Sequence, residues 1–273
     1  MIVWVDKMKT IAIANQKGGC GKTTTAVNVA ASFAHVGKRV IIVDLDSQAH
    51  ATLGLGVAPE ELHRTVYDII TDPQISTAKV VMKTNTEGLD IIPSNILLSG
   101  AESELVTMYD REYVLQKHLE TLGDDYDVCV IDCSPSLSIL TLNALVASTD
   151  VLIPVQTHYY ALEGLKQLLE TIDVVKSRFN SSLKILGVLL TFVESRTLLS
   201  REVQRQMKDF FGKLVFDTVI HRNVRLAEAP SAGEPVLAYD VNSRGAQEYL
   251  ALINEIIEHE EKSRITQEDI INL

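Results

Sequence analysis

The amino-acid sequence predicts an α/β fold with a doubly wound, mostly parallel sheet flanked by helices. Short β-branched runs alternate with longer helical patterns along almost the whole chain, as they do when helices connect parallel strands. Some short runs are apolar throughout, such as Val40–Val43 and Val128–Ile131, which is typical of strands buried on both faces of a sheet. The 273 residues contain no repeat, low-complexity stretch or Pro/Gly-rich linker, so we expect a single domain.

The expected elements follow one another in regular alternation. The strands are short runs of β-branched and apolar residues, namely Thr10–Ala14, Arg39–Asp44, Leu89–Ile92, Asp127–Asp132, Val151–Val155, Lys184–Thr191 and Val215–Ile220. The helices are longer segments with apolar residues at helical spacing, namely Thr24–His35, Ser99–Met108, Glu112–Leu122, Ser138–Ala147, Leu162–Arg178, Ser200–Phe211 and Arg244–Glu261. We assign residues 1–8 to an N-terminal extension, 9–262 to the domain and 263–273 to a C-terminal tail.

Composition excludes several classes of protein. Hydrophobic residues make up 46% of the chain and charged residues 22%, which supplies a large core and excludes a disordered protein. Lys and Arg number 25 against 36 Asp and Glu, and the net charge of −11 argues against a protein covered all over with nucleic acid, although it allows a local basic patch. No apolar run approaches the roughly 18–20 residues that span a bilayer.

The expected compartment is the cytoplasm. The segment Met1–Lys9 carries Asp6 and lacks the apolar stretch and cleavage site of a signal peptide. The cysteines Cys20, Cys129 and Cys133 are odd in number and lie in apolar or Gly-rich segments. This usage argues against an oxidised, secreted scaffold.

The strongest motif is a glycine-rich loop at residues 15–25, between an apolar strand and a helix. Its glycines let backbone N–H groups surround a phosphate, because no Cβ blocks the approach. Lys22 is expected to pair with the β- and γ-phosphates of ATP, and the Thr23 hydroxyl to bind Mg²⁺. The ordinary pattern G-x-x-x-x-G-K-[ST] is not met, because Gln16 replaces its first glycine and a second lysine, Lys17, follows. The expected nucleotide-binding residues of the loop are Lys17, Gly18, Gly19, Cys20, Gly21, Lys22, Thr23 and Thr24.

Acidic residues end two of the expected strands. Asp44 and Asp46 share a face at the carboxyl edge of the sheet, where ligands of open α/β sheets bind. Asp132 follows four apolar residues and has the position of a Walker B aspartate, which holds Mg²⁺ through water. Cys129 and Cys133 could also be considered as metal ligands, but no other Cys or His cluster completes a site, so buried core thiols are the favoured interpretation.

The loop Lys17–Thr24 resembles the deviant Walker A motif of the ParA/Soj/MinD ATPases, and the resemblance covers roughly residues 9–260. In that family the additional lysine reaches the nucleotide of the partner subunit in an ATP-dependent dimer, which implies a catalytic role for Lys17 beside Lys22. Residues 44–48 resemble the family motif D-x-D-P-Q, which implies that Asp46 orients the attacking water and that Asp44 supports the Mg²⁺ site. Ser47 and Ser134 stand where the family has proline.

Further blocks indicate the ParA/Soj branch. Residues 220–231 resemble I-P-R-N-x-R-L-x-E-A-P-S, with His221 in place of proline, and imply that Arg222 and Asn223 border the adenine. Ser195-Arg196-Thr197 upstream points to ParA/Soj in preference to MinD. Ile153–Gln156 and Tyr160–Leu165 resemble the segment after the fifth strand of the family, with His158, interpreted as a surface substitution, where an acidic residue is usual.

Basic residues concentrate between Ser195 and Arg225. Seven Lys and Arg face three Asp and Glu there, a local charge of 7 − 3 = +4 in a chain of −11. A solvated helix face would explain this, but clustered Lys and Arg are also what sequence-independent binding to DNA phosphates needs. The resemblance assigns DNA contacts to Arg196 and Arg225, and we add Arg201, Arg205 and Arg222 as supports.

The leading interpretation is a DNA-segregation ATPase of the ParA/Soj type. Such a protein dimerises on ATP, binds double-stranded DNA without sequence preference, associates with the nucleoid and is reset when a ParB-like centromere-binding protein stimulates hydrolysis. A membrane-cycling ATPase of the MinD type is one alternative, but residues 258–273 carry five acids against two basic residues, which an anionic membrane would repel. A metabolic or metal-carrier P-loop ATPase is another, and a metal carrier would need paired cysteines at a dimer face. The sequence does not distinguish a chromosome from a plasmid as cargo.

Overall fold

The computed structural model describes residues 8–158 and 163–271, and they form a seven-stranded sheet of order β3-β4-β2-β5-β1-β6-β7. The strands are β1 (Lys9–Ile13), β2 (Val40–Leu45), β3 (Met82–Lys83), β4 (Leu89–Ile92), β5 (Val128–Cys133), β6 (Asp150–Gln156) and β7 (Lys184–Thr191). Every neighbouring pair is parallel except β3 with β4 at the edge. The predicted α/β fold with a mostly parallel sheet is therefore confirmed.

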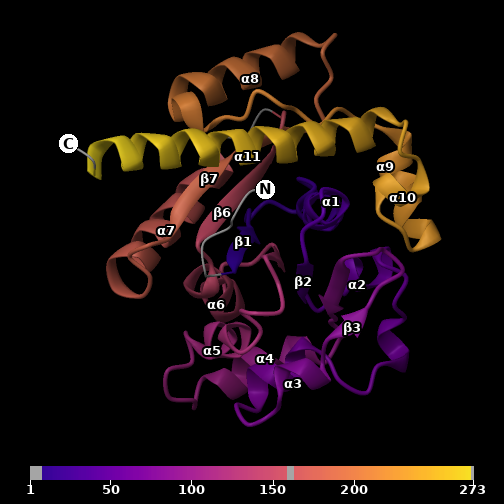
Figure 1. Cartoon of the computed structure of the whole chain (residues 1–273), viewed down its shortest axis with the longest axis vertical. Coiled ribbons are helices and arrows are strands. Elements are labelled where there is room, and N and C mark those ends of the chain that lie inside the picture. Colours follow the sequence, from indigo (N-terminus) through magenta and orange to yellow (C-terminus); the bar gives the residue numbers. More distant parts are fainter. Residues whose placement is uncertain (1–7, 159–162, 272–273) are drawn as a thin grey trace.

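Helices cover both faces of the sheet (Figure 1). They are α1 (Lys22–His35), α2 (His50–Gly54), α3 (Val66–Thr71), α4 (Leu98–Leu105), α5 (Val114–Glu120), α6 (Ile139–Ala147), α7 (Lys166–Arg178), α8 (Leu198–Phe211), α9 (Val224–Glu228), α10 (Val236–Tyr239) and α11 (Arg244–Ile271). One buried apolar cluster joins α1 and α11 to alternate residues of the strands, and a second joins α3 to α8 to the opposite residues. This alternation explains why the central strands are apolar throughout.

The carboxyl ends of the central strands are aligned by the register of the sheet. β1 lies between β5 and β6, and Ile13 is opposite both Asp132 and Leu152. On the other side of β5, Asp132 is opposite Asp44 of β2. Because the strands are parallel, the loops that follow β1, β2 and β5 all leave the same edge. The glycine-rich loop and the acidic strand ends therefore meet there, as the sequence predicted.

The expected strand Val215–Ile220 is not a strand. Only isolated parallel bridges form, from Val215 to Val188 and from His221 to Val193. The backbone N–H groups of Asp217 and Thr218 donate instead to the carboxylate of Glu255 on α11, at 2.7 and 2.9 Å. Phe216 and Ile220, on either side of these two residues, still donate their N–H groups to the carbonyls of Val188 and Leu190 on β7, at 3.1 and 2.8 Å. The pairing with β7 is therefore interrupted in the middle of the segment, and no continuous strand forms.

Several helices differ from their predicted bounds. α3 was not predicted, although Thr65 and Asp68 form a capping box around its first turn. α8 begins at Leu198, two residues before the predicted start, because the Thr197 side chain caps it. α11 continues to Ile271, beyond the predicted end at Glu261 and through most of the predicted tail. The predicted extension 1–8, except its last residue, and residues 159–162 of the Tyr160–Leu165 block lie outside the described residues.

Candidate active site

The loop after β1 forms an anion-binding cradle. Gly19 and Gly21 have positive φ angles of 72° and 85°, a backbone conformation that other residues rarely adopt. A Cβ at Gly18 or Gly19 would meet no atom within 4 Å, so the backbone there faces open space. α1 begins directly after this loop, at Lys22, and directs its positive N-terminal end toward the cradle. The geometry is that of a phosphate-binding loop.

The two lysines of the loop differ in environment. Lys22 is only 7% exposed, and its ammonium group donates to the backbone carbonyl of Lys17 at 3.1 Å. Lys17 is partly exposed, and its ammonium group has no hydrogen-bond or ion-pair partner among the described residues. The Lys22 ammonium is thus held inside the phosphate loop, whereas the Lys17 ammonium is available to contact a negatively charged group outside this loop.

The rest of the fold fixes the loop in place through residues that the sequence did not reveal. Asn15 donates to the carbonyl of Pro154 at 2.7 Å and accepts from the N–H of Lys17 at 2.9 Å. Thr191, at the end of β7, donates to the carbonyl of Cys20 at 2.9 Å. The next residue, Phe192, has a φ of 51°, and its ring lies 3.3 Å from where a Cβ on Gly21 would be. A strained aromatic residue therefore supports the loop from behind.

Asp44 organises the segment that follows β2. It is fully buried, and its carboxylate accepts from the N–H and the hydroxyl of Thr52 on α2, at 2.8 and 2.7 Å, and from the N–H of Asp46 at 3.2 Å. Burial raises the pKa of Asp44 to about 6, although its hydrogen bonds oppose the shift. Both oxygens are occupied, which favours an orienting role for Asp44 over direct metal binding.

Asp46 lies where the segment turns toward α2. Its side chain accepts from the N–H of Gln48 at 3.0 Å, and its carbonyl accepts from the N–H of Ala49 at the same distance. Ala49 has a φ of 53°, which shows how tight the turn is. The second oxygen of Asp46 has no hydrogen-bond partner among the described residues, so the carboxylate remains partly exposed and able to bind water.

Asp132 at the end of β5 has the features of a Mg²⁺-binding carboxylate. It is 1% exposed, and neither carboxylate oxygen has a hydrogen-bond partner within residues 8–158 and 163–271. Burial and the neighbouring Asp44 raise the pKa of Asp132 well above its usual range, while Thr23 and Lys22 favour the ionised form without compensating fully. A cation would satisfy these buried oxygens. The Thr23 hydroxyl and Asp132 are therefore the residues that fit Mg²⁺, the latter directly or through water.

A cavity of about 410 Å³ continues from the phosphate loop between α1, α2 and the 229–232 turn. Thr23 and Thr24 line its inner end. The other lining residues are Val27, Asn28, His50, Leu53, Gly54, Ala229, Pro230, Ser231 and Glu234. The expected adenine-bordering residues Arg222 and Asn223 are not among them. Asn223 accepts from the N–H of Arg225 as the cap of α9, and Arg222 pairs with Glu194 at 3.2 Å.

The residues proposed to bind DNA are all exposed, but most are paired within the chain. Arg205 pairs with Glu202 at 2.7 Å, and Arg225 pairs with Glu228 at 2.8 Å and Asp240 at 3.3 Å. Arg196 and Arg201 have no ion-pair partner in the described part of the chain. Arg196, just before α8, and Arg201, in its first turn, therefore carry positive charge that is available to a ligand.

The remaining features of the sequence have structural explanations. Cys20, Cys129 and Cys133 are free and buried, and burial raises the pKa of all three thiols. In the described ranges no cluster of three or more His, Cys, Asp or Glu side chains forms a metal site by itself. No helix there is long and apolar enough to cross a membrane. Ser134 lies beside Ser136, with the two hydroxyls 3.0 Å apart, on an exposed loop after Asp132.

Comparison with known proteins identifies close relatives. A family model described as AAA domain matches residues 8–185. The chain is 51% identical to the sporulation initiation inhibitor protein Soj of Bacillus subtilis over 91% of this chain and 98% of that protein. It is 44% identical to the chromosome partitioning protein ParA of Myxococcus xanthus over 94% of this chain and 90% of that protein.

A solved structure supports the same arrangement. A Mycobacterium smegmatis protein named cobyrinic acid a,c-diamide synthase, with bound ADP and magnesium, superposes with a TM-score of 0.83. It is 35% identical in sequence, and the match covers 94% of this chain and 96% of that chain. Its bound ADP and magnesium agree with the ligands that the cradle and Asp132 fit.

Proposed function

This chain belongs to the Soj/ParA family of partitioning ATPases, and from that membership and the geometry of its site we propose that it is a DNA-segregation ATPase that dimerises on ATP. The feature that supports this most directly is the pair of lysines in the phosphate loop. Lys22 is enclosed by its own loop, and the Lys17 ammonium has no hydrogen-bond or ion-pair partner among the residues that the structure describes. An ATPase complete within one subunit would not need the second charge.

The ATPase uses ATP and Mg²⁺, and its residues divide the work. The backbone N–H groups of residues 18–23 and the Lys22 ammonium bind the phosphates. Bound Mg²⁺ would neutralise charge that develops on the phosphate oxygens. The Thr23 hydroxyl and Asp132 would hold this cation, and the partly free carboxylate of Asp46 would orient the attacking water. The carboxylate of Asp44 accepts a hydrogen bond from the N–H of Asp46 and so holds Asp46 in place.

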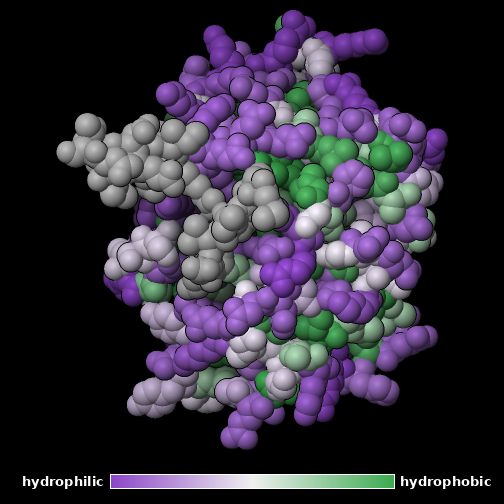
Figure 2. Space-filling model, in the orientation of Figure 1, coloured by the Kyte–Doolittle hydropathy of each residue, from purple (hydrophilic) through white to green (hydrophobic). Residues whose placement is uncertain are grey.

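The proposed dimer brings Lys17 of each subunit to the phosphates of the other. A lysine that arrives across an interface adds positive charge where the transition state becomes more negative, as an arginine finger does. Exposed apolar side chains lie near the nucleotide site, including Leu53 at 46% and Val224 at 69% exposure. Figure 2 shows hydrophobic surface in the region of α9 and α10, which could be covered in such a dimer.

We expect Lys17→Ala to bind ATP as a monomer without completing the shared site. Its ATP affinity should stay within about threefold of the native value, because the phosphate cradle and Lys22 are intact, whereas turnover should fall by about 10³-fold, as loss of an arginine finger does. Size-exclusion chromatography with ATP measures the dimer, and phosphate release measures turnover. Lys79→Ala, at an exposed site in the 77–79 turn, is the matched control. Native dimerisation and turnover in the Lys17 variant would refute the role across the interface.

The proposed DNA-binding surface is the segment from Arg196 to Arg225. In a monomer with a charge of −11, this segment is a local concentration of positive charge that can attract DNA. Two patches joined in one dimer make the second contact intramolecular, which increases affinity without new contacts. Binding should therefore require ATP, show no sequence preference and weaken with salt at a log–log slope of about −0.9 per phosphate neutralised.

We expect Arg196→Glu and Arg201→Glu each to weaken DNA binding by about tenfold or more while ATP-driven dimerisation persists. These two arginines have no acidic partner among the described residues, so their charge is available to phosphates, and each reversal changes two charges. Fluorescence anisotropy of a labelled duplex with ATP, ADP and no nucleotide at rising salt measures the effect. Arg64→Glu, an exposed site far along the chain, is the control. Native DNA affinity in both variants would show that these arginines belong to a solvated surface that does not bind DNA.

The partner that resets the cycle is proposed to be a ParB-like centromere-binding protein, and the cytoplasmic nucleoid is the proposed location. A metabolic function is the second candidate, because the M. smegmatis protein carries the name of a synthase. Sequence identity is lower there than to Soj, at 35% against 51% with similar coverage. Stimulation of ATP hydrolysis by DNA together with a ParB-like protein would support the partitioning function, and indifference to both would favour the metabolic one.

A further inference from the structure

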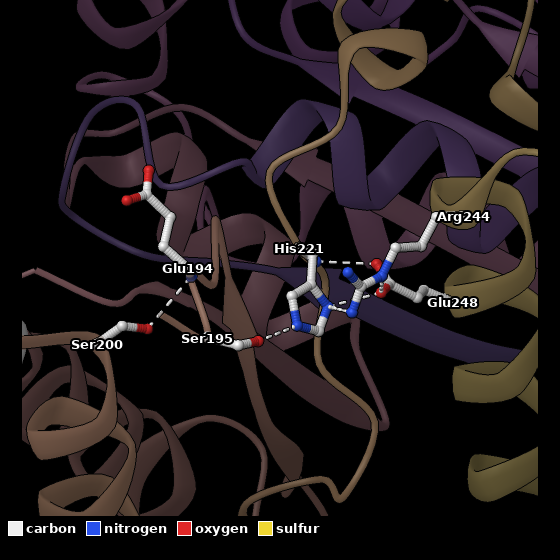
Figure 3. A network of polar contacts seen from close by, with 6 residues as sticks. All are labelled: Glu194, Ser195, Ser200, His221, Arg244 and Glu248. Carbon is white, nitrogen blue, oxygen red and sulfur yellow. Dashed lines mark hydrogen bonds and ion pairs between the residues drawn. The ribbon is translucent and has the colours of Figure 1, made fainter. Parts of the chain in front are cut away.

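His221 lies at the centre of a polar cluster that joins α11 to the start of α8 (Figure 3). Its Nδ1 is 2.6 Å from Oε1 of Glu248 on α11, and its Nε2 is 2.9 Å from the Ser195 hydroxyl. Its backbone N–H also donates to Oε2 of Glu248 at 2.8 Å. Glu194, next to Ser195, donates its N–H to the Ser200 hydroxyl of α8 at 3.3 Å. His221 thus links α11 to Ser195, and the preceding residue, Glu194, links the same segment to α8.

The ring of His221 couples the two ends of this cluster. The guanidinium of Arg244, which can only donate, places Nη2 2.7 Å from the same Nδ1. If Nδ1 carries the proton, it donates to Glu248, and Nε2 must accept from Ser195. If Nδ1 accepts from Arg244, Nε2 carries the proton and donates to Ser195. The groups on α11 thus determine the direction of the hydrogen bond to Ser195.

The cluster is enclosed enough for these contacts to matter. The side chains of His221 and Glu248 are 14% and 13% exposed, whereas Arg244 is 59% exposed. Glu248 accepts from the backbone and ring of His221 and from Nε of Arg244 at 2.7 Å. The charged groups that face the ring are Glu248 and Arg244 of α11, and the ion pair of Glu194 with Arg222 lies on the adjacent residues.

The segments that His221 joins carry two arginines of the proposed DNA surface, Arg196, which has no ion-pair partner among the described residues, and Arg222, which pairs with Glu194. Arg196 directly follows Ser195, and Arg222 directly follows His221. Backbone hydrogen bonds between Val193 and residues 220 and 222, at 3.0 and 3.4 Å, keep the two segments side by side. Because Ser195 and Arg196 are adjacent, a contact that fixes Ser195 restrains the backbone from which Arg196 extends.

We propose that His221 is a positioning residue for DNA binding, whose ring holds the Ser195 turn against α11 and so places Arg196 and Arg222 on one surface. The inference rests on the DNA binding proposed above. The motif that this block resembles has proline at this position, and proline has neither an imidazole side chain nor a backbone N–H to donate to Glu248. The contacts of His221 with Ser195, Glu248 and Arg244 form what we call the clamp.

The clamp predicts a specific pH profile. A protonated ring donates from both nitrogens, to Glu248 and to Ser195, and it repels Arg244, which is exposed enough to turn toward solvent. Protonation therefore keeps both hydrogen bonds, strengthens them because the donor is now charged, and adds positive charge beside Arg222. DNA affinity at constant ionic strength should rise from pH 8 to pH 6 by about threefold to tenfold more in the native chain than in His221→Gln, the gain expected when a neutral hydrogen bond becomes charge-assisted.

Two measurements on the full chain test the clamp separately from DNA binding. Hydrogen exchange without DNA should be faster in peptides covering residues 193–201 of His221→Gln, Ser195→Ala and His221→Pro than in the native chain. Anisotropy with labelled duplex and ATP should show weaker binding and a flatter pH profile for His221→Gln and Ser195→Ala, with ATP-driven dimerisation retained. His63→Gln, at an exposed site, should match the native chain in both.

The outcomes are distinguishable. Native exchange rates in the Gln and Ala variants would overturn the clamp whether or not the chain binds DNA. Faster exchange with unchanged DNA affinity and pH profile would overturn the positioning role and leave the proposed function standing. A native chain that binds no DNA under any nucleotide condition would overturn both the positioning role and the DNA binding on which it rests.

Discussion

We expect Lys22→Ala to bind ATP at least about 100-fold more weakly than the native chain. Lys22 is the buried charge of the phosphate loop, 7% exposed and oriented by the carbonyl of Lys17. Removing one member of a buried, hydrogen-bonded charge pair costs about 2–5 kcal/mol, which converts to a loss between tens-fold and thousands-fold. Equilibrium titration with a fluorescent ATP analogue in the presence of Mg²⁺ measures the affinity.

Two comparisons make this result specific. Lys17→Ala should retain ATP binding, so the two lysines, five residues apart in one loop, should differ in the step that they affect. Lys79→Ala reports on the loss of an exposed charge alone. Circular dichroism should show that Lys22→Ala is folded, since the aliphatic part of the side chain contributes little to the two apolar clusters. Native affinity in a folded Lys22→Ala protein would invalidate the phosphate-loop assignment.

The central part of the fold could be predicted because its signals are local. Apolar runs such as Val40–Val43 are buried on both faces, so pattern and structure correspond directly. The glycine-rich loop also carries its own geometry, because positive φ angles at Gly19 and Gly21 are permitted by residue type alone. Asp44 and Asp132 were placed at one edge by the rule that parallel strands end together, and their register confirms it.

The predictions from sequence failed where residues far along the chain determine the local structure. Val215–Ile220 has the composition of a strand, but Glu255, far along the chain, accepts the N–H groups of Asp217 and Thr218 in its middle. No sequence pattern indicated that Phe192, itself in a left-handed conformation, would lie against Gly21. Nor did any pattern indicate that Thr52 would donate both its N–H and its hydroxyl to the carboxylate of Asp44. These contacts depend on the packing of the whole domain. The missed helix α3 differs, because Thr65-x-x-Asp68 is a readable cap.

The count of basic residues overstated how much positive charge between Arg196 and Arg225 is available to bind DNA phosphates. The sequence shows seven basic residues there, but it does not show that Arg205, Arg222 and Arg225 each pair with an acidic residue. Exposed ion pairs of this kind contribute little to stability, roughly 0–1 kcal/mol, so DNA phosphates can compete for these arginines. The unpaired Arg196 and Arg201 are therefore the better first targets, and the paired residues should contribute less per charge.

We expect Asp46→Ala to bind ATP normally but to hydrolyse it about 10²–10⁴-fold more slowly, the contribution typical of a well-positioned base. The side-chain hydrogen bond of Asp46 goes to its own turn, at Gln48, and not to the phosphate loop, so the variant should keep its affinity for nucleotide. Slow hydrolysis should then trap the ATP-bound dimer, because the reset step is blocked. Size-exclusion chromatography with ATP measures the dimer, and phosphate release measures the rate.

The trapped dimer separates a catalytic role of Asp46 from a structural one. The Asp46 side chain also caps its own turn through the N–H of Gln48, so a disrupted turn could lower activity by misplacing α2. Asp46→Asn preserves that acceptor and removes only the charge, and it should be as slow as Asp46→Ala if the carboxylate positions water. Asp125→Ala, at an exposed site, should hydrolyse ATP at the native rate. Recovery of turnover in Asp46→Asn would assign the residue to the turn, and a monomeric Asp46→Ala protein with native turnover would exclude it from hydrolysis altogether.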